Sequence, residues 1–229
     1  MPKLNWDLSG ERLYETGVSQ GVLYPQVNGK YPKGVAWNGL SSVTESPSGA
    51  EPTPIWADNM KYLNLMSVEE FGASVEAYMY PEEFDPCQGN VFVVDGVTIG
   101  QQEHQPFGMS YKTIVGNDTA GNKYGYKLHL IYGAVAAPAE KNHSTVNDSP
   151  EPMTMSWALS TTAVAVPGYD PTSSLTIDST KVDAAVLKAV EDALYGTDAE
   201  EAHLPLPDEL FALMTAAATA AAQAAQANT

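Results

Sequence analysis

Three acidic residues close to a tyrosine are the first side chains whose types and spacing could do chemistry. Glu82, Glu83 and Asp85 follow Tyr80 in the phrase YPEEFD, and two carboxylates can serve as acid and base in glycoside hydrolysis. Adjacent residues of an extended segment point to opposite sides, however, so neighbouring carboxylates do not converge on one bond. The sequence therefore favours a solvated acidic loop. The alternative, a hydrolase that uses Glu82 or Glu83, would require a measured activity that is lost on Glu→Gln substitution.

Histidine and cysteine side chains give no clearer site. The single cysteine, Cys87, rules out an intramolecular disulfide, and no histidine stands near it in sequence to activate the thiol. Asn117, Asp118 and Asn122 lack the alternate ligands and the closing glutamate of a calcium loop, so a plain turn is the better interpretation. We therefore expect no catalytic residue, no metal and no cofactor. Four scattered histidines also lack the spacing of a zinc site or a catalytic triad: His104, His129, His143 and His203.

The charge balance narrows the class of partner. The chain of 229 residues has 28 Asp and Glu against 11 Lys and Arg, a net charge of -17. A protein that grips nucleic acid needs Lys and Arg to neutralise phosphates, so this function is disfavoured. An acidic surface would suit a conduit through which DNA slides without sticking, and it also suits any soluble acidic protein. The sequence contains neither a signal peptide nor a membrane span, so we expect a chain that is made and folded in a cytoplasm.

Alternation of apolar and polar residues predicts a mainly β frame. Within residues 71–80, Phe71, Ala73, Val75, Ala77 and Met79 point one way and the polar residues the other. Residues 123–135 and 153–160 alternate in the same way. Residues 107–115 should pair with 123–135 through a turn-rich link, and Asp95-Gly96 predicts a small protruding hairpin.

The segment between residues 21 and 80 contributes further strands and a long exposed connection. We expect strands at 21–24, 35–43 and 55–65. Between the last two, TESPSGAEPTP has three prolines and a glycine that exclude a regular element. Residues 137–152 form a second exposed loop, and a last short strand begins at Leu175.

One flanking helix is predicted at about 182–195. Its apolar face should pack on the sheet, with Thr180 as N-cap, Asp183 three residues later, and Gly196 at the end. A second, short helix should start at Pro207, and the Ala-rich residues 215–229 are expected to be a frayed or flexible tail. The packing residues on the first helix are Val182, Val186, Val190 and Leu194.

Several long phrases resemble a known family. The phrases are GVAWNGLSSVTESPSGAEPTPIWADNMKYLNLMSVEEFGASVEAYMYPEEF, FGMSYKTIVGNDTAGNKYGYKLHLIYG and VNDSPEPMTMSWALSTT. They look like the major tail protein, the tail-tube subunit, of long-tailed, non-contractile bacteriophages (siphophages), and the resemblance extends over about residues 13–206. It implies a β-sandwich or barrel-like tail-tube fold with long inter-strand loops. It also implies a structural virion protein whose subunits form rings, usually hexameric, that stack into a tube for genome delivery.

Residue composition and the resemblance together give each part of the chain an expected role. Residues 1–20 would be an N-terminal arm, 21–206 the tail-tube β domain, and 207–229 a short helix with a flexible tail. The partners would be copies of the chain and, in the virion tail, tape measure, tail terminator and baseplate proteins, while DNA passes through the lumen without specific binding. The N-terminal arm is one candidate contact between rings. The others are the two exposed loops, for each of which an ordinary mobile surface loop is the alternative. Their residues are Thr44, Glu45, Ser46, Pro47, Ser48, Gly49, Glu51, Pro52, Lys141, His143, Asn147 and Asp148.

A β-rich module without catalysis remains the main alternative. It would be a capsid decoration or a carbohydrate-binding protein, with exposed aromatic side chains as its platform. Tyr78, Tyr80 and Tyr124 are the candidates for that platform. Glycan binding by a monomer would support this alternative, whereas assembly into rings or tubes would support the tail protein.

Overall fold

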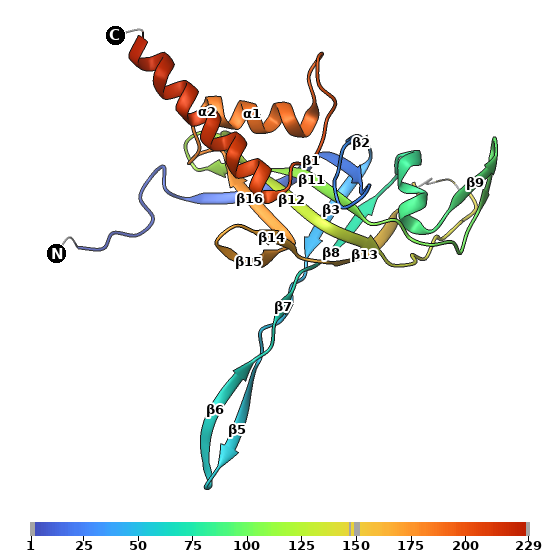
Figure 1. The fold of residues 1–229 in the computed structure, drawn as a ribbon, viewed down its shortest axis with the longest axis horizontal. Helices are drawn as coiled ribbons and strands as arrows, with labels where there is room; N and C mark the ends of the chain where they lie inside the picture. Colours follow the sequence, from blue (N-terminus) through green and yellow to red (C-terminus); the bar gives the residue numbers. More distant parts are fainter. Residues whose placement is uncertain (1–2, 147, 149–151, 228–229) are drawn as a thin grey trace.

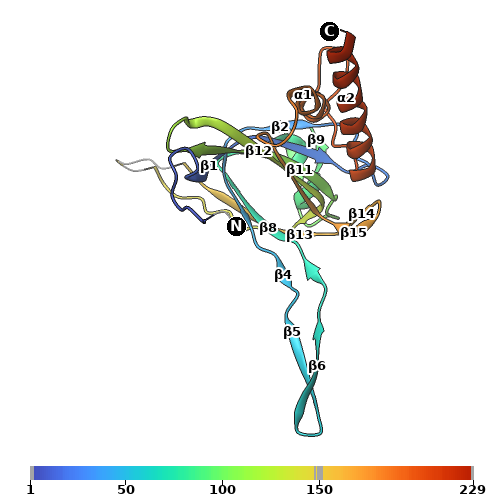
Figure 2. The ribbon, with the colours of Figure 1, turned by 90° about the vertical axis from the view of Figure 1, so that its left-hand side faces the viewer.

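One curved antiparallel sheet forms the body of the chain in a computed structural model that describes residues 3–146, 148 and 152–227. The strand order is β2-β1-β11-β12-β13-β8-β3, and β16 pairs with β12 beside β13. The sheet curls until β3 comes next to β1, as in a barrel (Figure 2). The mainly β, barrel-like prediction is confirmed. The strands are β1 (Leu13–Pro25), β2 (Val35–Trp37), β3 (Leu40–Glu45), β8 (Gly72–Ala77), β11 (Phe107–Asn117), β12 (Gly121–Ala136), β13 (Met155–Thr161) and β16 (Ser174–Asp178).

The inside of the curl holds the larger aromatic core. Residues of β8 and β13 alternate strictly between buried and less buried positions, as their sequences predict. Trp157 lies at the centre, with its ring 5.2 Å from Phe84, 5.6 Å from Tyr80 and 5.8 Å from Trp37. Phe84 belongs to a 3-10 turn (Glu82–Phe84) that closes this end of the core, followed by a second at Pro86–Gln88.

Two helices cover the outer face of the sheet over β1, β11, β12 and β16, and they lie side by side (Figures 1 and 2). The first, α1 (Ala184–Tyr195), matches the predicted helix and ends at Gly196 as expected. The expected N-cap was wrong. The Asp183 carboxylate accepts the bond from the Ala185 amide, whereas the Thr180 hydroxyl donates to Asp178 in the turn after β16.

The predicted short C-terminal helix is wrong in length. Helix α2 (Pro207–Ala227) continues through the Ala-rich segment that the sequence analysis assigned to a tail. Alanine has the highest helix propensity, so an anchored first turn can extend without further packing. Leu210 anchors that turn because it is fully buried against the sheet cluster. Asp208 and Glu209 lie in the same turn, where acidic side chains complement the helix dipole.

Two other expectations about the strands are corrected. Residues 13–20 belong to the sheet, because β1 starts at Leu13 and pairs with β11 along its length, with bulges near Gly17 and Gln20. The single strand expected over 35–43 is two strands, β2 and β3, separated by a turn at Asn38-Gly39.

Strand β12 bends at Gly133, where φ is 59° and a Cβ would meet the Thr162 carbonyl at 2.2 Å. There β12 changes partner from β16 to β13.

Three two-stranded ribbons project from the body (Figure 1). The longest, residues 46–71, extends far from the barrel and is here named the arm. The expected hairpin around Asp95-Gly96 is confirmed, and a further hairpin lies at 164–172. No helix in the described part of the chain is long and apolar enough to cross a membrane. The ribbon strands are β4 (Ser48–Gly49) with β7 (Glu69–Glu70), β5 (Pro52–Ala57) with β6 (Met60–Met66), β9 (Val91–Val94) with β10 (Val97–Ile99), and β14 (Val164–Val166) with β15 (Tyr169–Thr172).

Candidate assembly surfaces

The arm is a two-stranded ribbon inserted between β3 and β8. The single strand expected over 55–65 is in fact two strands, β5 and β6, which turn back at Asp58 and Asn59. Both turn residues have positive φ, 52° and 60°. Two consecutive left-handed residues favour a turn whose twist matches that of a hairpin, and Asp and Asn tolerate this conformation better than other side chains. The expected irregular connection over 44–54 is also wrong, since it contains β4 and the first half of β5.

The strand register divides the arm into two different faces. Residues directly opposite in an antiparallel pair share a face, and the pairs are Thr53 with Leu65, Ile55 with Leu63 and Ala57 with Met60. This face, here named the aliphatic face, contains no charged residue. The opposite face contains Pro52, Pro54, Trp56, Lys61, Asn64 and Met66.

Most large side chains of the arm are exposed. Eight apolar residues between positions 55 and 68 have 38% to 84% of their surface accessible. Together they offer on the order of 1,000 Å² of apolar area, more than the ~800 Å² that one partner contributes to a standard protein interface. An isolated two-stranded ribbon is only marginally stable in water. The arm therefore has the composition of a buried element without being buried by the described part of its own chain. The eight residues are Ile55, Trp56, Met60, Tyr62, Leu63, Leu65, Met66 and Val68.

The contact residues expected from the sequence lie at the root of the arm. Thr44 and Glu45 end β3 and pair with Ser74 and Ala73 of β8, so they belong to the barrel. Ser48 and Gly49 form β4, where they pair with β7. Ser46, Pro47, Glu51 and Pro52 are exposed around them.

The structure describes part of the second expected loop, residues 137–152. The Lys141 ammonium donates to the Tyr80 hydroxyl at 3.2 Å and lies 4.9 Å from the centre of that ring. Lys141 therefore packs on the end of the aromatic core. His143 and Asp148 are exposed, and Asn147 lies outside the described residues.

A polar cluster joins the arm root to the barrel where β1 and β3 meet. The Glu45 carboxylate accepts a 2.6 Å bond from the Tyr111 hydroxyl, and Tyr111 stacks on His129 with ring centres 4.6 Å apart. The two nitrogens of His129 lie 3.5 Å from Glu45 and 3.3 Å from Glu15. Burial and the neighbouring Glu45 raise the pKa of Tyr111, so its hydroxyl stays a donor. This cluster fixes the strand from which the arm leaves the body.

The predicted helix residues lie as follows. Val190 and Leu194 are fully buried in the outer cluster between α1 and the sheet. Val186 is buried, and Val182 packs against the same cluster from just before the helix. The sheet and helix are also joined by Tyr24, whose buried hydroxyl donates to the Leu194 carbonyl at 2.7 Å. These side chains hold α1 to the barrel.

The hairpin of β9 and β10 is a second apolar projection. Its large residues are 42% to 61% exposed, and Asp95 is the one charged residue in the stretch 91–99. The register pairs Val91 with Ile99 and Phe92 with Thr98. The exposed residues are Val91, Phe92, Val93, Val94, Val97 and Ile99.

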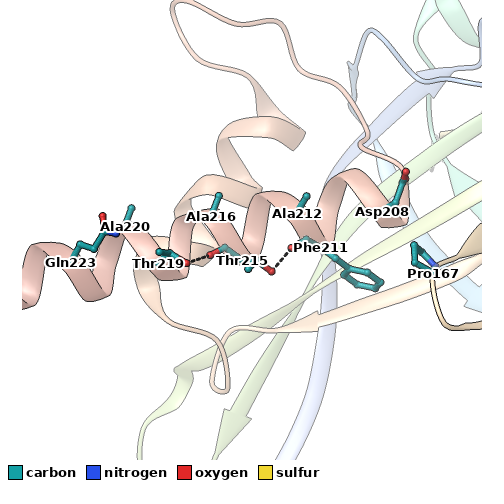
Figure 3. A pocket seen from close by; sticks show the side chains of 9 residues that line it. All are labelled: Pro167, Asp208, Phe211, Ala212, Thr215, Ala216, Thr219, Ala220 and Gln223. Carbon is teal, nitrogen blue, oxygen red and sulfur yellow. Dashed lines mark hydrogen bonds between the residues drawn. The ribbon is translucent and has the colours of Figure 1, made fainter.

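A shallow groove along α2 is lined mostly by small side chains (Figure 3). Phe211, Pro167 and Asp208 line one end, Gln223 lies at the other, and small Ala and Thr residues line the groove between them. The hydroxyls of Thr215 and Thr219 donate to backbone carbonyls one turn earlier in the same helix, at 2.7 and 2.8 Å. Their hydrogen-bonding capacity is thus used inside the helix, and the groove offers mainly small apolar contacts.

The side chains first considered for catalysis do not converge. Glu82 and Glu83 are exposed, whereas Asp85 is buried and accepts 2.9 Å bonds from the side chains of Gln88 and Asn90. Asp85 therefore holds its own turn. Among the residues that the structure describes, no group of three or more His, Cys, Asp or Glu side chains is placed to hold a metal ion.

The tyrosines of the alternative binding platform do not form one surface. Tyr80 packs edge-on against Phe84 and Trp157 in the core. Tyr78 and Tyr124 are exposed, but they follow β8 and lie in β12, strands that are separated in the sheet by β13. The structure thus offers no row of aromatic rings at these three positions.

The chain is similar to known proteins in structure but not in sequence. No protein-family model matches the chain, and no curated protein matches it in sequence. One similar solved structure is a chain of the anti-feeding prophage baseplate, determined by cryo-EM with 6-fold symmetry, at 10% identity and a TM-score of 0.38 over 78% of this chain and 100% of that one. Another is a chain of the PVC sheath-tube complex of an extracellular contractile injection system in its extended state, at 11% identity and a TM-score of 0.30 over 76% of this chain and 94% of that one. Similarity at this level supports no argument about assembly.

Proposed function

We propose that this protein is a structural subunit of a siphophage tail, which self-assembles into stacked hexameric rings around a lumen for the genome. The observation that carries the proposal is the arm, with its eight exposed apolar residues on a ribbon held away from the body. A surface of this size and composition is typical of a permanent interface. The family phrases in the sequence support the same reading.

Contacts between different patches of identical chains explain how such an arm builds a tube. A heterologous contact repeats around an axis and closes into a ring, and rings can then stack. The net charge of -17 supports a lumen through which DNA moves without being held. Further partners would be the tape measure, terminator and baseplate proteins of a virion tail, assembled in the host cytoplasm.

Electron microscopy of the purified chain across concentration, with light scattering on the same samples, tests this function. We expect rings or hollow tubes above a critical concentration. The matched variant replaces residues 50–68 by Asn-Gly, a two-residue turn that fits between the paired Gly49 and Glu69. It should remain folded, with an unchanged circular dichroism spectrum, and form no rings or tubes.

Two results would count against the tube subunit. Normal tubes from the shortened variant would show that the arm is not the assembly element. A wild-type chain that stays monomeric at every concentration and also binds glycans would favour the β-rich binding module instead.

A further inference from the structure

The molecule has two apolar projections on an otherwise acidic chain. In the arm, residues 52–68 contain Asp58 and Lys61 and so have no net charge. In the β9–β10 hairpin, Asp95 is the one charged residue between 91 and 99. Two copies with a net charge of -17 each repel one another, and the repulsion is weakest where charge-poor surfaces meet. These two projections are therefore favourable places for copy-to-copy contact.

A heterologous assembly requires two different surfaces on one chain that fit each other. The arm and the hairpin leave the barrel in different directions (Figure 1). An arm–hairpin contact therefore links one copy to the next and leaves that copy's arm free for a third. An arm–arm contact would instead satisfy both surfaces in a closed dimer.

We propose that the aliphatic face of the arm docks on the β9–β10 hairpin of a second copy of this chain. This inference rests on the proposed self-assembly and names the surface that receives the arm. The hairpin offers on the order of 500 Å² of exposed apolar area, about half of what the arm offers. One face of the arm is thus enough to cover it.

The chemistry favours the aliphatic face over the opposite one. Ile55, Leu63 and Leu65 on that face match the Val-rich hairpin, and no charge or amide has to be desolvated there. The opposite face would bring Lys61 and Asn64 against valines. Burying these polar groups without partners would oppose binding.

Disulfide trapping between two singly substituted chains tests the contact. One chain has Leu65→Cys on the aliphatic face, and the other has Val93→Cys on the hairpin together with a tag that changes its mobility. The native Cys87 does not interfere, because it is fully buried and burial raises the pKa of its thiol to about 12. We expect a mixed dimer under mild oxidation. The matched control, Met66→Cys on the opposite face, should lose the mixed band because its thiol points away from the hairpin.

Three other outcomes overturn the docking. Dimers of the Leu65→Cys chain without a mixed band would mean that arms pair with arms. A mixed band from Trp6→Cys with Val93→Cys, and none from Leu65→Cys, would mean that the exposed N-terminal segment covers the hairpin instead. The absence of any mixed band, while microscopy shows tubes, would refute the docking and leave the tube function standing. A mixed band in samples that form only small oligomers would support the docking and refute the tube.

Discussion

At the scale of single residues, two tryptophans have opposite environments. Trp157 has none of its surface exposed and contacts three aromatic rings, whereas Trp56 on the arm is 66% exposed. We predict that Trp157→Ala lowers the free energy of unfolding by about 3–5 kcal/mol, because it leaves a cavity among rings that cannot collapse. Urea denaturation of the monomer, at concentrations below assembly, measures this change.

The matched control is Trp56→Ala. Its cost in monomer stability should be within about 0.5 kcal/mol, since an exposed side chain leaves no cavity. The same substitution should raise the critical concentration for assembly. A large loss of monomer stability in Trp56→Ala would mean that the arm packs on its own barrel in solution.

The Glu15 carboxylate links stability to pH. Burial opposes its ionisation, but hydrogen bonds from Lys127 and Thr113 outweigh this effect and lower its pKa below the ordinary value of 4.5. A carboxyl with a lowered pKa in the folded state stabilises the protein above the unfolded pKa, and this contribution is lost as the pH falls through the folded pKa. Glu15→Gln should therefore make unfolding stability fall less steeply below about pH 4.5, by ~0.2–1 kcal/mol for a pair that is one-third exposed.

Urea titrations at several pH values measure the Glu15 effect. Glu83→Gln serves as control because Glu83 is exposed on the 3-10 turn. An equal change in both variants would assign the effect to net charge rather than to the contacts of Glu15.

At the scale of elements, the residue that caps the start of α1 differs from the one that the sequence predicted. Asp183 caps the helix through a 2.8 Å bond to the Ala185 amide, and Thr180 bonds to Asp178 outside it. Asp183→Ala should cost about 1 kcal/mol of unfolding free energy, measured by thermal or urea denaturation. Thr180→Ala should lower the unfolding free energy by less than Asp183→Ala does. A larger loss in Thr180→Ala than in Asp183→Ala would indicate that Thr180 is the cap.

Strands with one buried face could be predicted from the sequence, whereas the arm could not. Alternation in β8 and β13 reports which side chains face the core, and the structure confirms it. The run 55–65 is rich in large apolar residues, and this composition cannot distinguish burial within a chain from burial against another chain. The signal that was missed is Asp58-Asn59 in the middle of the run, since both residues tolerate the left-handed region that a tight hairpin turn needs.

The candidate contact site was predicted only at its edge. The prolines around Thr44–Pro52 correctly marked an exposed segment, but the sequence assigned contact to these root residues and only a strand to the apolar residues beyond them. The C-terminal segment was missed for a related reason. Its alanines have no apolar stripe to signal packing, so propensity and the anchoring of Leu210 decide the length of α2.

At the scale of the whole molecule, a strong like charge opposes the contacts that the apolar projections favour. Each copy has a net charge of -17, and repulsion between exposed charges extends over a Debye length, which falls from about 30 Å at 0.01 M salt to about 10 Å at 0.1 M. Apolar contacts are not weakened by this screening. The charge repulsion between copies and the apolar contacts therefore respond differently to salt.

We predict that the critical concentration for assembly falls several-fold as sodium chloride rises from about 0.02 M to about 0.5 M, because screening removes the repulsion and leaves the arm contacts intact. Light scattering across a dilution series at each salt concentration measures it. The variant with residues 50–68 replaced by Asn-Gly should stay unassembled throughout, which separates arm-mediated growth from general salting out. A critical concentration that rises with salt would mean that ion pairs between copies drive assembly. In that case the acidic root of the arm, with Glu51, Glu69 and Glu70, would replace its apolar faces as the principal contact.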